Sequence, residues 1–337
     1  MTNYWLQKRR IMKAKELTLK VAREAITRLI GYPKNRGIDN SRVQYFDDDA
    51  NKYIYQQIAN ALSNGKGYAL GKLGTVELGC IVSYLKRDKW TFDDYAKFLR
   101  GYPVPLFYEK EILRLNNNAG VFPAKESIGD KFCELMLKDI DVIDTLASYA
   151  WCERYILKRI SHCSTVNLDG YYAPFMFKQP WTRILENKRV LVIHPFAKSI
   201  ECQYAKREAL FSNPLVLPRF KSLRVIQAVQ SIAGNSCGFT DWFSALNYMK
   251  DEMEKEDFDI ALIGCGAYGF PLTVHAKRLN KVGIHLAGWT QMLFGIYGKR
   301  WLTDQPQYAK FINDDWIRPD KDEVPKNSGK VEGGCYW

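Results

Sequence analysis

A glycine-rich turn, Gly264-Cys-Gly-Ala-Tyr-Gly269, is the segment of this 337-residue chain whose residue types and spacing point most clearly to ligand chemistry. The apolar run 260–263 precedes it, and Pro271 suits the first turn of a following helix. Glycines between a strand and a helix let the main chain approach a ligand, and the free N–H groups of the helix start favour a phosphate. A tight turn without a ligand fits the same pattern, so both interpretations stay open. The candidate ligand-binding residues of this turn are Gly264, Gly266, Tyr268 and Gly269, with Tyr268 either stacked on a base or sugar or packed on the neighbouring helix.

The residues after this turn do not fit a dinucleotide cofactor. An NAD or FAD site needs a carboxylate about 20 positions further on, which binds the ribose hydroxyls. After Gly269 the next carboxylate is Asp304, and basic side chains fill the interval: Lys277, Arg278, Lys281, Lys299 and Arg300. We therefore expect no NAD or FAD, and instead a phosphate or diphosphate in basic surroundings.

Two other segments place polar side chains where predicted strands end. Lys72-Leu-Gly-Thr-Val-Glu77 follows a short strand that begins at Tyr68, and His194 closes the buried-strand pattern 189–193. In a doubly wound sheet, ligands bind outside the carboxyl ends of the strands. We therefore expect both segments to meet the glycine turn at one edge of the sheet.

Each of these side chains has a candidate role and an ordinary alternative. Glu77 is the candidate catalytic residue, as a general base or a metal ligand; otherwise it stabilises the start of a helix. Lys72 would neutralise phosphate charge, with Gly74 and Thr75 in the same binding segment. His194 would hydrogen-bond a diphosphate or serve as a structural histidine.

The elements predicted around these segments alternate between strand and helix. A short strand and turn are expected at 68–74, further strands near 189–195, 223–229, 258–263 and 282–286, and helices at 47–62, 75–85, 199–211, 239–255 and 271–279. This alternation predicts an α/β fold with a Rossmann-like doubly wound, mostly parallel sheet. We assign residues 37–300 to this domain, with a helical insertion at about 90–160, and expect 301–337 to form an irregular C-terminal tail packed on it.

The first 36 residues carry most of the net charge of +12, since ten Lys or Arg against two Glu give +8 there. Apolar residues interleave with these charges at helical spacing, which predicts a basic amphipathic helix over 1–36. Such a helix could lie on an anionic membrane surface or dock on the domain with a solvated basic face.

Composition also bears on whether the protein is membrane-spanning, secreted, disulfide-bonded or nucleic-acid-binding. No run of 18 apolar residues and no apolar signal-peptide region are present, and the eight cysteines form no CxxC pair. We expect reduced thiols and a cytoplasmic location, peripheral at the inner face of the membrane if the basic helix binds there. No DNA- or RNA-binding motif is present, so no nucleic acid partner is expected.

Several motifs within residues 45–337 carry a resemblance to a known family. They are Leu70-Gly-Lys-Leu-Gly-Thr-Val-Glu-Leu78, His194-Pro-Phe196, Gln203-Tyr204, Lys206-Arg207, the turn at 263–269, Gly295-Ile-Tyr-Gly-Lys-Arg-Trp301 and Val331-Glu-Gly-Gly-Cys-Tyr-Trp337. In these motifs the chain resembles a group of bacterial proteins associated with surface-polysaccharide synthesis. That group is related to glycosyltransferases of the GT-D fold, a Rossmann-like architecture.

The resemblance implies a glycosyltransferase that uses a nucleoside-diphosphate sugar and a glycan or lipid-linked acceptor. Those transferases bind the donor and a divalent metal through Asp-x-Glu after an early strand, where this chain has Thr75-Val-Glu77. Because a hydroxyl is a weaker ligand than a carboxylate, Mn²⁺ or Mg²⁺ binding is weakened. Three outcomes then remain open. The substrate phosphates hold the metal, Lys72 and other cations take the place of the metal, or the protein has lost transferase activity. The alternative is a non-catalytic nucleotide- or sugar-binding protein that supports polysaccharide assembly.

Overall fold

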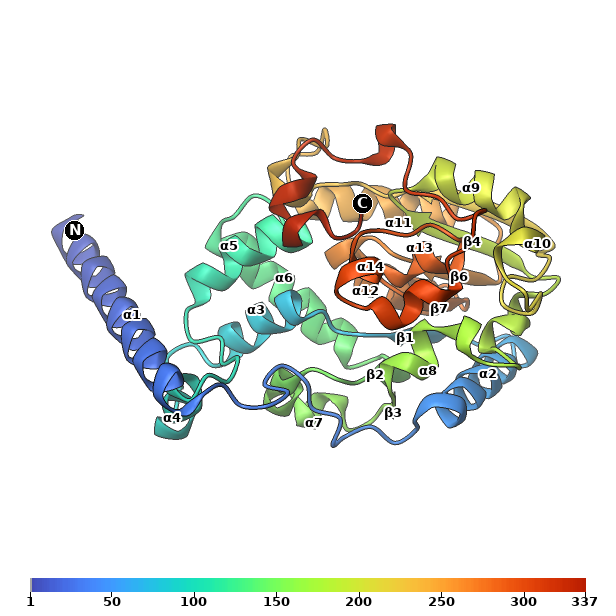
Figure 1. The fold of residues 1–337 in the computed structure, drawn as a ribbon. Coiled ribbons are helices and arrows are strands. Elements are labelled where there is room, and N and C mark those ends of the chain that lie inside the picture. The colour runs from blue at the N-terminus through green and yellow to red at the C-terminus, as the bar shows by residue number, and fades with distance from the viewer. Residues whose placement is uncertain (1) are drawn as a thin grey trace.

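The chain folds around a seven-stranded sheet in which every paired strand is parallel (Figure 1). The computed structural model describes the main chain of residues 2–337 and the side chains of 14–331 and 333–337. The strand order is β3-β2-β1-β7-β6-β4-β5. The strands are β1 (Tyr68–Gly71), β2 (Thr145–Ala147), β3 (Ser164–Val166), β4 (Arg189–His194), β5 (Ser222–Gln227), β6 (Ile260–Ile263) and β7 (Val282–His285). The predicted doubly wound, Rossmann-like α/β class is confirmed.

Apolar side chains on both faces of the strands explain why the sheet is covered on both sides. In β4, Val190 and Val192 enter one core, whereas Leu191 and Ile193 enter the other. One face is covered mainly by α2 (Asp47–Ser63), α8 (Leu168–Tyr172), α9 (Ala197–Ala205), α13 (Trp289–Leu293) and α14 (Arg300–Thr303). The other face is covered by α3 (Thr75–Leu85), α5 (Tyr108–Ala119), α6 (Glu126–Ile140), α11 (Trp242–Glu254) and α12 (Gly269–Arg278).

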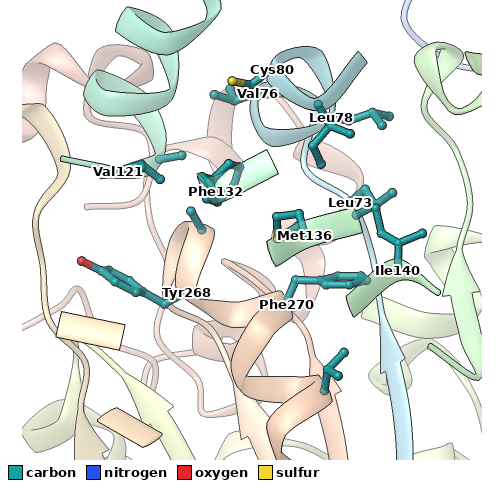
Figure 2. Close-up of a cluster of buried hydrophobic side chains, with 14 of the residues drawn as sticks. Leu73, Val76, Leu78, Cys80, Val121, Phe132, Met136, Ile140, Tyr268 and Phe270 are labelled. Carbon is teal, nitrogen blue, oxygen red and sulfur yellow. The ribbon is translucent and has the colours of Figure 1, made fainter. Parts of the chain in front are cut away.

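Side chains from distant parts of the chain meet in the core between the sheet and the helices α3, α5, α6, α11 and α12. Figure 2 shows Leu73, just before α3, and Val76, in its first turn, together with Phe132 of α6 and Phe270 of α12. This packing fixes the start of α3 relative to the glycine turn, and both border the site described below. The segment expected as a helical insertion contains α4 (Phe92–Leu99), α5 and α6, and also β2, which joins the sheet.

The N-terminal helix α1 (Thr2–Ile30) is a single long helix that projects from the body (Figure 1). Its C-terminal half docks beside α4, where Arg23 Nη2 donates to the Gly101 carbonyl at 3.0 Å and Thr27 is buried. Leu17 and Leu29 remain 64% and 85% exposed. The predicted helix is therefore present and partly docked. Among the described residues, none of the helices is long and apolar enough to cross a membrane.

The remaining short helices connect these layers and form most of the tail. They are α7 (Leu157–Ile160), α10 (Arg207–Leu210) and 3₁₀ turns at Trp151–Tyr155, Pro174–Met176, Trp181–Leu185, Ile232–Gly234, Gly266–Tyr268, Pro306–Phe311, Lys321–Glu323, Ser328–Lys330 and Glu332–Gly334. Tail residue Glu323 is buried and accepts hydrogen bonds from Lys198 N and Ser199 N. The tail thus crosses the start of α9 before its last residues return to the sheet edge.

Candidate functional site

A cleft of about 270 Å³ opens at the carboxyl ends of β1, β7, β6 and β4. The neighbouring strands β4 and β6 form a point where the chain connections change direction. The chain passes from β4 to β5 on one side of this point and from β6 to β7 on the other. Ligands of doubly wound sheets bind at such a point. Eight of the nine residues singled out from the sequence line the cleft: Lys72, Gly74, Thr75, Glu77, His194, Gly264, Gly266 and Tyr268.

The glycines of the turn at 264–269 have structural reasons to be glycine. A Cβ on Gly264 would overlap the Ala287 carbonyl oxygen and lie 2.7 Å from the His194 ring. Gly266 has a φ of 58°, in the left-handed region that glycine adopts easily. Gly269 is outside the cleft lining, and a Cβ there would overlap the ring of His285. Close packing within the protein therefore accounts for this motif without a ligand.

Tyr268 is held in the core rather than presented to a ligand. Its ring stacks on Trp242 of α11 with centroids 5.0 Å apart and planes 10° apart, and its hydroxyl lies 2.9 Å from Ser231 Oγ. Burial raises the pKa of the phenol, so the hydroxyl stays protonated. The structure thus places this ring as the packing alternative expects.

His194 is buried at the end of β4 and offers one nitrogen to the cleft. Its Nδ1 accepts the Phe196 N–H at 3.0 Å, so the neutral ring carries its proton on Nε2. Burial lowers the pKa of His194 to about 3, which keeps the ring neutral at physiological pH. Among the described residues no hydrogen bond to Nε2 is present, so this N–H can serve a ligand.

The start of α3 carries the single acidic side chain that lines the cleft among the described residues, Glu77. Gly74 is the N-cap of α3, Thr75 is its first residue, and the Glu77 carboxylate folds back over Gly74, where a Cβ would overlap Oε2. A carboxylate in the first turn is favoured by the helix dipole. Glu77 is therefore both suited to stabilise the helix start and directed at the cleft.

Two cations lie beside this carboxylate. Lys72 is half-buried with Nζ 5.6 Å from the Tyr149 ring. Burial alone would lower the pKa of Lys72, but nearby oxygens, first that of Tyr149, outweigh this and raise the pKa. Arg300, from α14, lines the cleft and donates through Nη1 to the Tyr336 hydroxyl at 2.9 Å. The cleft therefore holds two positive charges against one carboxylate among its described side chains.

The C-terminal tail forms one wall of the cleft. Val331, Tyr336 and Trp337 line it. Gln291 Nε2 donates to the Tyr336 carbonyl at 3.1 Å, and Arg300 N donates to the Cys335 carbonyl at 2.8 Å. Sequence reasoning did not place this wall in the site. The two motifs that build it, at 295–301 and 331–337, were singled out only for the family resemblance.

His285, at the end of β7, is another residue that sequence reasoning left out of the site. It lines the cleft and is buried. Burial, with the neighbouring Lys72 charge, lowers the pKa of His285 to about 3. Neither ring nitrogen forms a hydrogen bond of ordinary geometry with the described residues, although the Lys72 main chain lies close enough to influence the pKa. The ring is neutral and packs between Gly71 and Gly269.

The donor set of the cleft does not fit a tightly held divalent metal. Mn²⁺ and Mg²⁺ prefer several oxygen ligands, carboxylates above all. Among the side chains that the structure describes, no group of three His, Cys, Asp or Glu is placed to hold a metal ion. Glu77 instead has Lys72 and Arg300 in the same cleft. A bound cation would meet repulsion from both.

Comparisons with protein-family models, with curated proteins and with solved structures find no match. The class of the protein therefore follows from its fold: an α/β protein with a doubly wound, Rossmann-like parallel sheet. Its candidate site is the cleft at the carboxyl edge of that sheet.

Proposed function

We propose that this protein is a glycosyltransferase that moves a sugar from a nucleoside-diphosphate sugar to an acceptor in the synthesis of cell-surface polysaccharide or glycolipid. The observation that carries the proposal is the cleft itself. It combines one carboxylate, two cations and a neutral histidine N–H at the edge of the sheet where nucleotides bind in this fold class. Transfer from a diphosphate donor needs a group that takes a proton and groups that stabilise the departing charge.

The donor diphosphate is bound by the positive side of the cleft. Lys72 and Arg300 supply charge, His194 Nε2 supplies a neutral hydrogen bond, and the first turn of α3 presents its free N–H groups. These groups replace the charge that a divalent metal supplies in the transferases that the chain resembles. Donor binding is therefore metal-independent under this proposal.

Glu77 acts as the general base in the transfer step. The acceptor hydroxyl oxygen forms a new bond to the anomeric carbon of the donor sugar, and its proton passes to the Glu77 carboxylate. The bond from that carbon to the diphosphate breaks, and its electron pair leaves on the diphosphate. Lys72 and Arg300 stabilise this charge as it develops.

A second candidate function is a non-catalytic nucleotide- or sugar-binding protein that supports polysaccharide assembly. Thr75 favours it, because this position carries an acidic metal ligand in the transferases that the chain resembles. The two proposals share the donor site and differ in what Glu77 does there.

Replacing Lys72 by Ala is expected to weaken nucleoside-diphosphate binding about 10- to 100-fold, since a hydrogen bond to a charged group contributes roughly 1.5–3 kcal/mol. Isothermal titration with UDP, GDP, CDP and TDP in EDTA measures the effect. Lys66→Ala is the matched control, because this exposed lysine precedes β1, at the opposite end of that strand. Binding that appears only after Mn²⁺ is added would contradict the metal-independent site. Failure of all four nucleotides to bind would contradict both the transferase and a nucleotide-binding role.

We also propose that α1 brings the protein to an anionic membrane surface. Residues 1–36 have a net charge of +8, and the described part of α1 exposes the apolar side chains Leu17, Val21, Leu29 and Ile30. The basic side chains before Ala14 lie outside the described ones. Apolar burial and attraction to anionic lipid act together in such helices.

A Leu29→Glu variant is expected to bind anionic vesicles several-fold more weakly, because it removes an apolar contact and adds a repelled charge. Co-sedimentation with phosphatidylserine-containing vesicles at low salt measures this binding. Leu157→Glu is the control, since that leucine is 44% exposed on α7, outside α1. Equal loss in both variants, or binding that survives removal of residues 1–36, would reject the membrane role.

A further inference from the structure

A second cavity, of about 510 Å³, lies where α1 packs against the body. Its walls come from the docked half of α1, the loop 103–107, the start of α3, and α5, closed by Trp151. It is separate from the cleft, but Thr75 lines both. The first turns of α3 thus form a shared wall, with Glu77 facing the cleft while Leu78 and Gly79 face the cavity.

Positive charge predominates in this cavity. Its cationic lining side chains are Lys20, Arg23, Lys110 and Arg114, and its acidic ones are Glu24 and Glu111. Glu24 is paired outside the cavity with Arg28 at 2.7 Å. Burial lowers the pKa of Lys110, and the neighbouring Lys20 lowers it further. Burial likewise lowers the pKa of Arg23. Lys20, which is ion-paired with Glu16, and Lys110 repel each other, and a bound anion would relieve that repulsion.

A buried carboxyl group in the same cavity has an oxygen left unsatisfied. Glu111 is 8% exposed, and its Oε2 has no hydrogen-bond partner among the described residues. This oxygen is ion-paired with Arg114, whose Nη1 lies 3.6 Å away. Gly79 provides the space, because a Cβ there would lie 2.9 Å from this oxygen. Buried polar atoms without partners are uncommon, and a hydroxyl-bearing ligand would satisfy this one.

The remaining walls are apolar and aromatic. Phe98, Phe107 and Trp151 line the cavity together with Pro103, Val104, Pro105 and Leu106. Such walls favour an alkyl chain or the apolar face of a sugar. A ligand that fits the whole cavity therefore joins an anionic group to an apolar one and carries a hydroxyl.

We propose that this cavity is the acceptor subsite, and that it takes an acceptor with a phosphate group attached to an apolar chain. The phosphate lies among Lys20, Arg23, Lys110 and Arg114, a hydroxyl bonds Glu111, and the acceptor end passes Thr75 to reach Glu77. That the bound molecule is an acceptor rests on the proposed transferase function. The preference for an amphipathic phosphate does not, since it follows from the cavity alone.

Binding of octyl phosphate tests the cavity, with octyl glucoside as the neutral probe of equal chain length. Titration calorimetry is performed below micelle formation on the full chain and on Lys110→Ala/Arg114→Ala. Both side chains are on the exposed side of α5, and thermal unfolding shows whether the fold is retained once Arg114 no longer pairs with the buried Glu111. Lys131→Ala/Lys138→Ala on α6 removes two exposed lysines elsewhere and is the matched control.

We expect octyl phosphate to bind at least tenfold more tightly than octyl glucoside, and to lose at least tenfold in affinity in the α5 double variant but not in the control. Equal affinity for both probes, or equal octyl phosphate binding by both double variants, overturns the inference. UDP titration separates the two proposals. A protein that binds octyl phosphate as expected but no nucleotide keeps the phosphate subsite and loses the transferase function.

Discussion

Replacing Glu77 by Gln is expected to reduce sugar transfer by about 10²–10⁴-fold, the usual contribution of a general base. Nucleotide affinity should change little, because Gln keeps the size of the side chain and its acceptor oxygen near Gly74. The carboxylate lies at the start of α3 with Lys72 in the same cleft, so its loss removes the proton acceptor while the phosphate-binding groups stay. Donor hydrolysis and transfer to a panel of acceptors measure the effect.

Glu201→Gln on α9 is the matched control, because that glutamate is exposed and outside the cleft lining. Thermal unfolding of the Glu77 variant shows whether the helix start is retained. Transfer at the wild-type rate by Glu77→Gln would show that another group takes the proton. Nucleotide binding without turnover on any donor or acceptor, in wild type and variant alike, would favour the non-catalytic protein.

The central strands could be predicted because their sequences allow few alternatives. Val190 to Ile193 and Ile260 to Ile263 are buried on both faces of the sheet, which requires uninterrupted apolar runs. Their carboxyl ends then had to meet, and this placed His194 and the glycine turn in one cleft. β2 and β3 were missed because each has only three residues, too few for a recognisable period.

The site was predicted only in part, because one wall of it comes from the far end of the chain. Arg300 and Tyr336 are hydrogen-bonded although they lie 36 positions apart, and no local sequence pattern predicts such a contact. The role of Tyr268 was open for a similar reason, since its stacking partner Trp242 belongs to a different helix. Local spacing predicts which strand ends carry polar groups, but not which distant segment covers them.

Two glycines show how closely the tail is fitted to the cleft. A Cβ on Gly298 would lie 2.5 Å from the Tyr336 carbonyl carbon and oxygen and 2.6 Å from the Cys335 carbonyl oxygen. A Cβ on Gly288 would lie 2.5 Å from Cε1 of the Tyr336 ring. The first contact is with main chain and the second with a side chain. Only the second can be relieved by changing Tyr336.

Gly298→Ala is therefore expected to displace the tail, lower the free energy of unfolding by about 1–3 kcal/mol and weaken UDP binding about tenfold or more. Displacement moves Tyr336 away from Arg300 and opens one wall of the cleft. Chemical denaturation, UDP titration and the rate of tryptic cleavage after Lys330 measure these effects. Gly329→Ala is the control, because a Cβ there meets no atom within 4 Å.

Gly288→Ala should weaken UDP binding in the wild-type background and have little further effect in Tyr336→Ala, because removing the ring removes the overlap. Gly298→Ala should remain harmful in that background, since its overlap is with the main chain. This difference distinguishes displacement of the docked tail from a general loss of stability. A general loss of stability would make the effects of both glycine variants on UDP binding additive with that of Tyr336→Ala. Additivity in both cases, with tryptic cleavage unchanged, would show that the tail does not form the wall on which nucleotide binding depends.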